Sequence, residues 1–299
     1  MSQGQTGKAV NLDGMKIVVT GALGALGSAF CDAAAASGAR VVRTDFRPGG
    51  IAPSVEEPEL AQGGEAYHEC DVTDERRIFA LLGRLDEELE GIDVVANFAG
   101  RHHRVFDLPA DDPMDMASIF RDVIELNLTG AFLVTAAAAR IMVARRTGHI
   151  IHLCSNGSRA SLYGSYAYNA SKHGVEGIVK TAAAQLAPFG VRVNGVAPGT
   201  VLSDLNRSLS IDEKGEYRPR AKSILAHTPT KRFATAAGVA QSIVALCVPQ
   251  VHLTGNVVFC DDGYNIEGHS WPEGTQELYA GAGGLERLYA ELDRKYPRR

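Results

Sequence analysis

Met15-Lys-Ile-Val-Val-Thr20 runs directly into Gly21-Ala-Leu-Gly24-Ala-Leu-Gly27, and an alanine-rich segment continues from there to Ala36. The β-branched run predicts a strand, and the alanine-rich segment predicts a helix. A strand, a glycine-rich turn and a helix N-terminus form a cradle for a pyrophosphate, because backbone N–H groups and the helix dipole both attract negative charge. We therefore expect a dinucleotide-binding α/β fold.

A second strand-like run, Arg40-Val-Val-Arg-Thr-Asp45, ends in a carboxylate. In dinucleotide-binding folds a carboxylate at this point accepts hydrogen bonds from the adenosine ribose hydroxyls and repels a 2′-phosphate. Asp45 therefore predicts NAD in preference to NADP. Arg43 and Arg47 lie close enough to oppose that preference by binding the phosphate.

Strand-like and helix-like segments alternate along the chain, which predicts right-handed crossovers and a parallel sheet flanked by helices, a doubly wound Rossmann fold. The further strands are expected at 66–70, 92–96, 150–154 and 191–196, and the helices after Asp71, over 114–145 and around Tyr168. Ligands of such sheets bind outside the carboxyl ends of the strands. Polar and glycine-containing motifs fall at those ends, at Gly21, Asp45, Asn97, Ser155 and Pro198.

Ser155, Tyr168 and Lys172 are the candidate catalytic residues. The Tyr-x-x-x-Lys spacing is one helical turn, so both side chains leave the same helix face. An ammonium beside a phenol lowers the tyrosine pKa, and a tyrosine tuned in this way can exchange a proton with an alcohol or ketone oxygen. Ser155 follows an apolar strand and could donate a hydrogen bond to the same oxygen.

With these motifs in order, residues 15–264 resemble a short-chain dehydrogenase/reductase. Asp71-Val72 resembles the adenine contact of that family, Asn97-Phe-Ala-Gly100 its Asn-Asn-Ala-Gly motif, and Pro198–Ser203 the segment that contacts the nicotinamide. The resemblance implies an oxidoreductase in which Lys172 binds the nicotinamide ribose and Asn127 holds a water in the proton relay. The expected catalytic residues are Asn127, Ser155, Tyr168 and Lys172. The expected cofactor-binding residues are Gly21, Leu23, Gly24, Ala25, Leu26, Gly27, Asp45, Asp71, Val72, Asn97, Ala99, Gly100, Tyr168, Lys172, Pro198, Gly199 and Val201.

Two departures from the family pattern keep other interpretations open. The spacing Gly21-x-x-Gly24-x-x-Gly27 is closer to the branch that acts on sugar nucleotides, so an epimerase or dehydratase is one alternative. Asp262 replaces a glycine of the closing turn, so the chain is expected to take a different course there. A nucleotide-sensing Rossmann module without turnover is the alternative from another class. The Tyr-x-x-x-Lys spacing disfavours an enoyl reductase.

The substrate is expected to be polar and anionic, from the segment Arg101-His-His-Arg104 that directly follows Gly100. Arginine forks bind carboxylate and phosphoryl oxygens bidentately, although the same residues fit a solvated loop. Asn156 could add a polar contact after Ser155. The candidate substrate residues are Arg101, His103, Arg104 and Asn156, and the mixed-charge segment 202–229 is predicted to be a substrate lid.

Composition limits the partners. The net charge is −5 with no basic stripe, which argues against nucleic acid. We expect no apolar run to be long enough to cross a membrane, and the polar extension 1–14 lacks the apolar core of a signal peptide, so we expect a cytoplasmic protein. The five cysteines have no metal-ligand spacing, so we expect no metal and buried free thiols.

The single catalytic domain, 15–264, is followed by a tail, 265–299, with a short amphipathic helix expected near 284–294. We expect a homodimer or homotetramer that pairs through the long helices 114–145 and 165–186. The apolar residues that support this pairing are Ile119, Val123, Ile124, Phe132 and Val134.

Overall fold

A computed structural model describes residues 10–46, 59–60, 66–159, 162, 164–202 and 210–266. Arg47, residues 203–209 of the predicted lid and the tail beyond Ile266 lie outside the described residues.

Within the described residues, eight strands form one sheet in the order β3-β4-β2-β1-β5-β6-β7-β8. Their bounds are β1 Lys16–Thr20, β2 Arg40–Asp45, β3 Glu59–Leu60, β4 Ala66–Glu69, β5 Val94–Asn97, β6 Gly148–Leu153, β7 Val191–Pro198 and β8 Val257–Cys260. The short strand β3 pairs antiparallel with β4, and every other pairing is parallel. The strand order reverses direction between β1 and β5, which is where a doubly wound sheet opens a ligand crevice.

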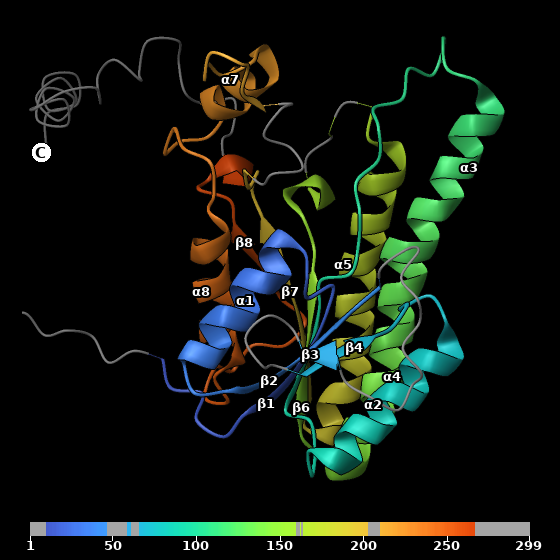
Figure 1. Cartoon of the computed structure of the whole chain (residues 1–299), viewed down its shortest axis with the longest axis vertical. Coiled ribbons are helices and arrows are strands. Elements are labelled where there is room, and N and C mark those ends of the chain that lie inside the picture. Colours follow the sequence, from blue (N-terminus) through green and yellow to red (C-terminus); the bar gives the residue numbers. More distant parts are fainter. Residues whose placement is uncertain are drawn as a thin grey trace, which may run out of the picture.

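Helices cover both faces of the sheet (Figure 1). Helices α1 (Ala25–Ala36) and α8 (Ala236–Cys247) pack together on one face, and α2 (Glu75–Glu88), α4 (Gly130–Arg145) and α5 (Tyr166–Leu186) cover the other. Helix α3 (Pro113–Ile124) packs against α5 and continues into α4, and α7 (Pro219–Ala226) lies beyond the carboxyl ends of the strands. The predicted Rossmann fold is therefore confirmed.

Each face has its own apolar core because successive strand residues point to opposite sides. Val18, Val95 and Ile150 face α2 and α4, whereas Ile17, Val19 and Ile151 face α1 and α8. All six side chains have 0% exposure. The near-continuous apolar runs of the strands reflect burial on both faces, as parallel sheets require.

The segment 113–145 is one continuous helical stretch of 33 residues. Contrary to the sequence expectation, it is long and apolar enough to cross a membrane by length and composition alone. In the structure its α4 part packs on the sheet and α2, with Val134 and Met142 fully buried, as the core helix of a folded domain does. Val123 is also fully buried, so Val123 and Val134 serve the core of their own chain, whereas Phe132 is 57% exposed.

Two further sequence expectations concern particular side chains. Cys31, Cys70, Cys154 and Cys247 are buried free thiols and Cys260 is partly buried; burial raises the pKa of Cys70, Cys154 and Cys247 to about 12. The backbone of Asp262 has φ 53°, the left-handed conformation that glycine adopts most easily. Asp262 therefore retains the conformation suited to a glycine instead of changing the course of the chain, and its carboxylate pairs with Arg232 at 3.0 Å. Aspartate tolerates this region better than most residues.

Candidate active site

The turn between β1 and α1 is shaped by two glycines that have no room for a side chain. Gly21 has φ +66°, and a Cβ on it would lie 2.4 Å from the backbone N of Ala99. A Cβ on Gly27 would lie 2.2 Å from the Gly21 carbonyl oxygen. Gly24 is the N-cap of α1 and has no side-chain cap, so the first N–H groups of this helix are available to a phosphate. The residues present therefore fit the pyrophosphate of a dinucleotide.

Asp45 lies at the carboxyl end of β2 and contacts this turn. One carboxylate oxygen accepts a hydrogen bond from Leu23 N at 2.8 Å, and the other accepts one from Phe46 N at 2.7 Å. Arg43, which could have bound a 2′-phosphate, is 7% exposed and pairs with Asp32 of α1 at 2.7 Å.

A chain of buried polar side chains crosses the carboxyl edge of the sheet. Thr20, Asn97 and His152 are neighbours in register on β1, β5 and β6. Thr20 donates a hydrogen bond to Asn97 Oδ1, so the amide nitrogen of Asn97 faces His152 Nδ1 at 3.3 Å and donates to it. The other ring nitrogen of His152 then carries the hydrogen, and Nε2–H donates to Thr135 Oγ1 at 2.8 Å. Thr135 in turn donates to the Ala131 carbonyl at 2.8 Å. Each group has a partner, and the chain ties the end of β1 to α4.

Ser155, Tyr168 and Lys172 meet just beyond this edge. Ser155 lies just past the end of β6, after Cys154, while Tyr168 and Lys172 lie on the first turns of α5. Ser155 hydrogen-bonds with Tyr168, and Gly157 N donates to Ser155 Oγ at 3.0 Å. Lys172 Nζ lies 5.8 Å from the centre of the Tyr168 ring and donates to the Leu153 carbonyl at 2.6 Å. The three side chains therefore lie together at the carboxyl edge of the sheet.

Burial dominates the ionisation of this group. Desolvation raises the pKa of Tyr168, although the hydrogen bond with Ser155 opposes the shift. Desolvation also lowers the pKa of Lys172 to about 8. We expected from the sequence that the pKa of Tyr168 would be lowered, and this is wrong, because its pKa is raised. The cost of removing the phenolate from water is larger than the stabilisation that the hydrogen bond with Ser155 provides.

Asn127 lies in a wider π-helical turn, Glu125–Thr129, that separates α3 from α4. Its side-chain oxygen accepts a hydrogen bond from Arg101 N at 2.8 Å, and its amide nitrogen donates to Arg101 O at 2.9 Å and to Ser171 Oγ at 3.1 Å. The side chain therefore anchors the start of the loop after β5. A Cβ on Gly100 would lie 3.1 Å from Asn127 Oδ1 and 3.7 Å from Lys172 Nζ, so this glycine keeps the site open.

The remaining predicted cofactor residues lie at other strand ends. Asp71 Oδ1 accepts hydrogen bonds from the backbone and hydroxyl of Thr73, which fixes the turn before α2. Val72 is buried against α4 at Gly130. At the end of β7, Gly199 N donates to the Cys260 carbonyl at 3.0 Å, and Val201 forms an isolated bridge with Ala234.

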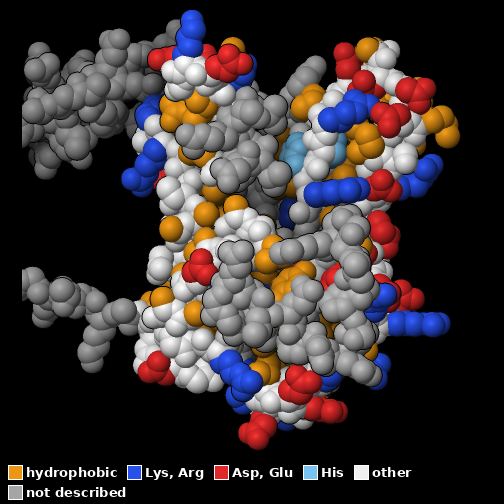
Figure 2. Space-filling model, in the orientation of Figure 1, with side chains coloured by type: hydrophobic (Ala, Val, Ile, Leu, Met, Phe, Trp, Pro, Cys, Tyr) orange, Lys and Arg blue, Asp and Glu red, His pale blue; other side chains and the backbone are white. Residues whose placement is uncertain are grey.

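The four candidate substrate residues differ in burial and in the groups they contact. Asn156 is buried, and its side-chain oxygen accepts a hydrogen bond from Ser155 Oγ at 3.2 Å. Arg101 and Arg104 are exposed and pair with carboxylates, Arg101 with Asp122 at 3.6 Å. His103 is half-buried, and burial lowers its pKa. Figure 2 shows histidine side chains on the upper part of the molecule, beside a mixed group of acidic and basic side chains.

Sequence reasoning missed His102 and His152. The His102 ring lies 4.5 Å from the Tyr168 ring, centre to centre, and His152 is the middle of the buried polar chain. The position of His152 could have been found from the sequence, because it precedes Ser155 by three residues on a strand aligned with Asn97. The position of His102 depends on the course of a loop, which the sequence does not specify.

Comparison with known proteins agrees with the fold. A family model described as enoyl-(acyl carrier protein) reductase matches residues 21–265. A 3-oxoacyl-(acyl-carrier-protein) reductase of Vibrio harveyi is 30% identical over 257 residues, which is 85% of this chain and 98% of the relative. The chain belongs to the short-chain dehydrogenase/reductase family and is an oxidoreductase of that family.

Other relatives have different substrates in their names. A D-threitol dehydrogenase of Mycolicibacterium smegmatis is 30% identical over 257 residues, covering 86% of this chain and 95% of the relative. A gluconate 5-dehydrogenase of Burkholderia cenocepacia J2315, solved in complex with NADP and tartrate, superimposes with a TM-score of 0.73 at 27% identity, over 86% of this chain and 97% of that one.

Proposed function

We propose that this chain transfers a hydride between a nicotinamide dinucleotide and a polar secondary alcohol or its ketone. The observation that supports this best is that the group of Ser155, Tyr168 and Lys172 and the glycine turn Gly21–Gly27 lie at the same carboxyl edge of a doubly wound sheet.

When bound, the nicotinamide supplies the hydride acceptor for oxidation and the hydride donor for reduction. Tyr168 exchanges the proton with the substrate oxygen, as general acid–base catalysis requires. Ser155 holds that oxygen by a hydrogen bond and stabilises the charge that develops on it. Lys172 binds the nicotinamide ribose, and Asn127 maintains the backbone at the entrance to the site.

We propose NAD as the preferred cofactor. Asp45 at the end of β2 supports it, because a carboxylate there accepts hydrogen bonds from the ribose hydroxyls and repels a 2′-phosphate. The ion pair of Arg43 with Asp32 supports it further, since that guanidinium is already engaged. The related gluconate 5-dehydrogenase, solved in complex with NADP, is the observation that argues against a preference for NAD.

Relatives named for a 3-oxoacyl group, threitol and gluconate support a polar substrate, because each of these molecules has a ketone or a secondary hydroxyl. A nucleotide sensor without turnover is disfavoured, since it would have no need for the Ser155, Tyr168 and Lys172 set. For the sugar-nucleotide alternative, the glycine spacing remains the supporting observation.

We further propose a cytoplasmic homodimer or homotetramer that pairs through α5 and the helical stretch formed by α3 and α4. Buried free thiols suit a reducing compartment. Phe132 on α4 is a large exposed apolar side chain on this surface. Light scattering at micromolar concentration should give a dimer or tetramer, and Phe132→Glu should shift it toward the monomer. A monomeric parent protein would reject the pairing.

The experiment that tests the proposed function is a substrate panel. Purified protein is mixed with NAD or NADP and with secondary alcohols, polyols, hydroxy acids and sugars, and the absorbance of the reduced nicotinamide is followed. Turnover of a polar alcohol with a higher kcat/KM for NAD is the expected result. Cofactor binding without turnover of any alcohol or ketone would favour the sensor.

A further inference from the structure

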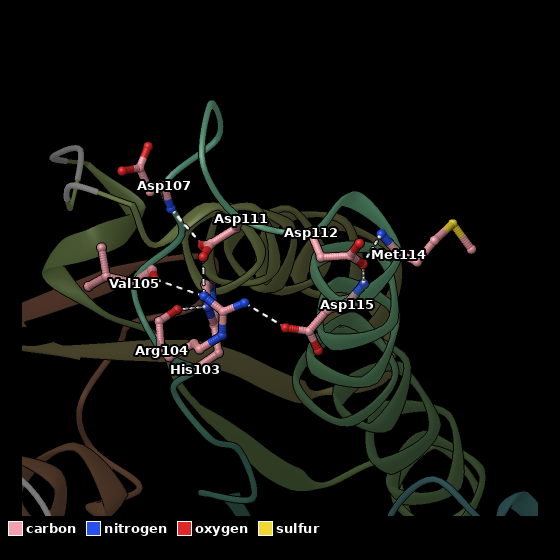
Figure 3. A network of polar contacts seen from close by, with 8 residues as sticks. All are labelled: His103, Arg104, Val105, Asp107, Asp111, Asp112, Met114 and Asp115. Carbon is pink, nitrogen blue, oxygen red and sulfur yellow. Dashed lines mark hydrogen bonds and ion pairs between the residues drawn. The ribbon is translucent and has the colours of Figure 1, made fainter.

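The loop 101–112, between β5 and α3, contains an arginine that makes ion pairs with two carboxylates. Arg104 Nη1 lies 2.7 Å from Asp111 Oδ2, and Arg104 Nη2 lies 2.6 Å from Asp115 Oδ2 (Figure 3). The two carboxylates raise the pKa of Arg104, and the hydrogen bond from Asp107 N, followed by that from Arg104, lowers the pKa of Asp111. The guanidinium edge that would bind an anion bidentately is thus shared between two side chains of the same protein.

Asp111 and the neighbouring Asp112 fix the end of the loop. Asp111 Oδ2 also accepts a hydrogen bond from Asp107 N at 2.8 Å. Asp112 is the N-cap of α3 and accepts hydrogen bonds from Met114 N and Asp115 N, both at 2.9 Å (Figure 3). Arg104 therefore ties the middle of the loop to the first turn of α3.

The part of the loop held in this way carries two stacked histidines toward the catalytic tyrosine. The His102 and His103 rings lie 5.5 Å apart at 20°, and the His102 and Tyr168 rings lie 4.5 Å apart at 41°. His103 also packs on Phe106 at 4.4 Å. Phe106 is 4% exposed, and its N–H donates to the Gly164 carbonyl at 2.9 Å, so the loop is anchored beside the start of α5.

The hydrogen bonds of His102 define its orientation. Its Nδ1 lies 2.6 Å from the His103 carbonyl oxygen, which can only accept, so Nδ1 carries the hydrogen. In the neutral ring Nε2 is then an acceptor, and it lies 3.2 Å from the hydroxyl of Ser165, the N-cap of α5. The imidazole is thereby oriented next to Tyr168 from the loop side.

We propose that Arg104 is a positioning residue. Together with Asp111 and Asp115 it forms a clamp that holds His102 against Tyr168. In this position His102 lines the substrate site beside the reacting oxygen. This role rests on the proposed function and replaces the anion-binding role that the sequence suggests for Arg104. A displaced His102 should weaken catalysis through substrate placement, because small errors in position are costly to a reacting pair.

The kinetic test compares Arg104→Ala, Arg104→Lys and the double variant Asp111→Asn/Asp115→Asn, with Arg121→Ala, an exposed arginine further along α3, as the matched control. We expect the first three to lower kcat/KM for the alcohol by roughly tenfold with cofactor affinity unchanged. Lysine should not rescue, since one ammonium cannot bridge two carboxylates in a fork. Combining Arg104→Ala with the double aspartate variant, or with His102→Ala, should add little to the larger loss.

An anion-binding role for Arg104 predicts a different pattern. Removing the two aspartates would then free the fork and improve affinity for anionic substrates, and Arg104→Lys would retain much of the activity. Either result overturns the clamp.

A second measurement does not depend on turnover, so it separates failure of the clamp from failure of the proposed function. The protein has nine histidines, and the His102 signal in a nuclear magnetic resonance spectrum of histidine-labelled protein is assigned by its loss in His102→Gln. The Tyr168 ring should shift the resonance of the His102 ring, and Tyr168→Leu should remove that shift. Arg104→Ala and the double aspartate variant should remove it as well, whereas Arg121→Ala should not. An unchanged His102 signal in Arg104→Ala would disprove the clamp even if no substrate is found.

Discussion

His149 and His152 lie three residues apart on β6, and both are buried, yet they serve opposite edges of the sheet. His152 points toward α4 at the carboxyl edge, and both of its ring nitrogens have partners in the chain from Thr20 to Ala131. His149 lies at the amino edge, where its Nε2 contacts Asn194 Nδ2 at 2.9 Å and its Nδ1 has no hydrogen-bond partner.

The neighbours of the two histidines explain the difference. At the amino edge Asn194 also donates to the Leu253 carbonyl at 2.8 Å and accepts from Asn256 N at 3.1 Å, so it joins β7 to the segment before β8. These contacts hold the sheet together and lie away from the glycine turn. From this comparison we infer that the polar groups at the carboxyl edge position the candidate site, whereas those at the amino edge support stability.

The largest expected effect tests the carboxyl edge. Tyr168→Phe removes only the hydroxyl that exchanges the proton, so turnover should fall at least about 100-fold. Cofactor affinity and melting temperature should match the parent. Steady-state kinetics, a cofactor titration and a thermal melt provide the three measurements. Near-normal turnover would remove Tyr168 from the mechanism.

The reverse pattern is expected at the amino edge. Asn194→Ala leaves the Leu253 carbonyl and the Asn256 N–H without their buried partner, so the free energy of unfolding should fall by roughly 2–4 kcal/mol. The kcat per folded molecule should stay close to that of the parent. Urea unfolding followed by circular dichroism measures the loss. A variant that is stable but slow would contradict the division between the edges.

Acid titration sharpens the comparison between the two histidines. Desolvation lowers the pKa of His152 to about 3 and that of His149 well below 6.5. Between those values and 6.5 the unfolded chain binds more protons than the folded one, so stability rises with pH through this window and is fully present above about 6.5. Each histidine should contribute at most about 1.4 kcal/mol per pH unit.

Replacing either histidine by glutamine should reduce that slope between about pH 5 and 6.5. His152→Gln should also weaken cofactor binding through Asn97, whereas His149→Gln should not. Urea midpoints across the pH range, with cofactor titrations at neutral pH, check both statements. Equal effects of the two variants on the cofactor would contradict the assignment of His152 to the site.

The smallest expected effect concerns the cofactor. Asp45→Asn retains an oxygen that can accept from Leu23 N but removes the charge that repels a 2′-phosphate. The ratio of kcat/KM for NAD over NADP should fall by roughly tenfold, equivalent to about 1.4 kcal/mol. An unchanged ratio, or a parent enzyme that already prefers NADP, would show that Asp45 does not set the preference.

The sequence predicted the sheet because its signals are local. The β-branched run before Gly21 and the alternation of strands and helices do not depend on distant contacts. What could not be predicted depends on tertiary environment. The pKa of Tyr168 rises because of burial, and the fork of Arg104 is engaged by Asp111 and Asp115, whose positions depend on the course of the loop.

Residue type alone also did not show which groups some side chains contact. The water relay expected for the asparagine at 127 stays a prediction, and the sequence did not show that its side chain also holds both backbone groups of Arg101. Helical spacing alone did not distinguish Val123 and Val134, which face the core of their own chain, from the exposed Phe132.

The hold of Asn127 on Arg101 has a consequence for how this enzyme could change. The loop begins at a backbone fixed by Asn127 and ends at the α3 N-cap, Asp112. Residues 102–111 therefore form a cassette between two fixed attachment points, while the residues that we propose exchange the proton lie outside it. Evolution, or a designer grafting a new segment between those points, can vary what enters the site without rebuilding the chemistry beneath it.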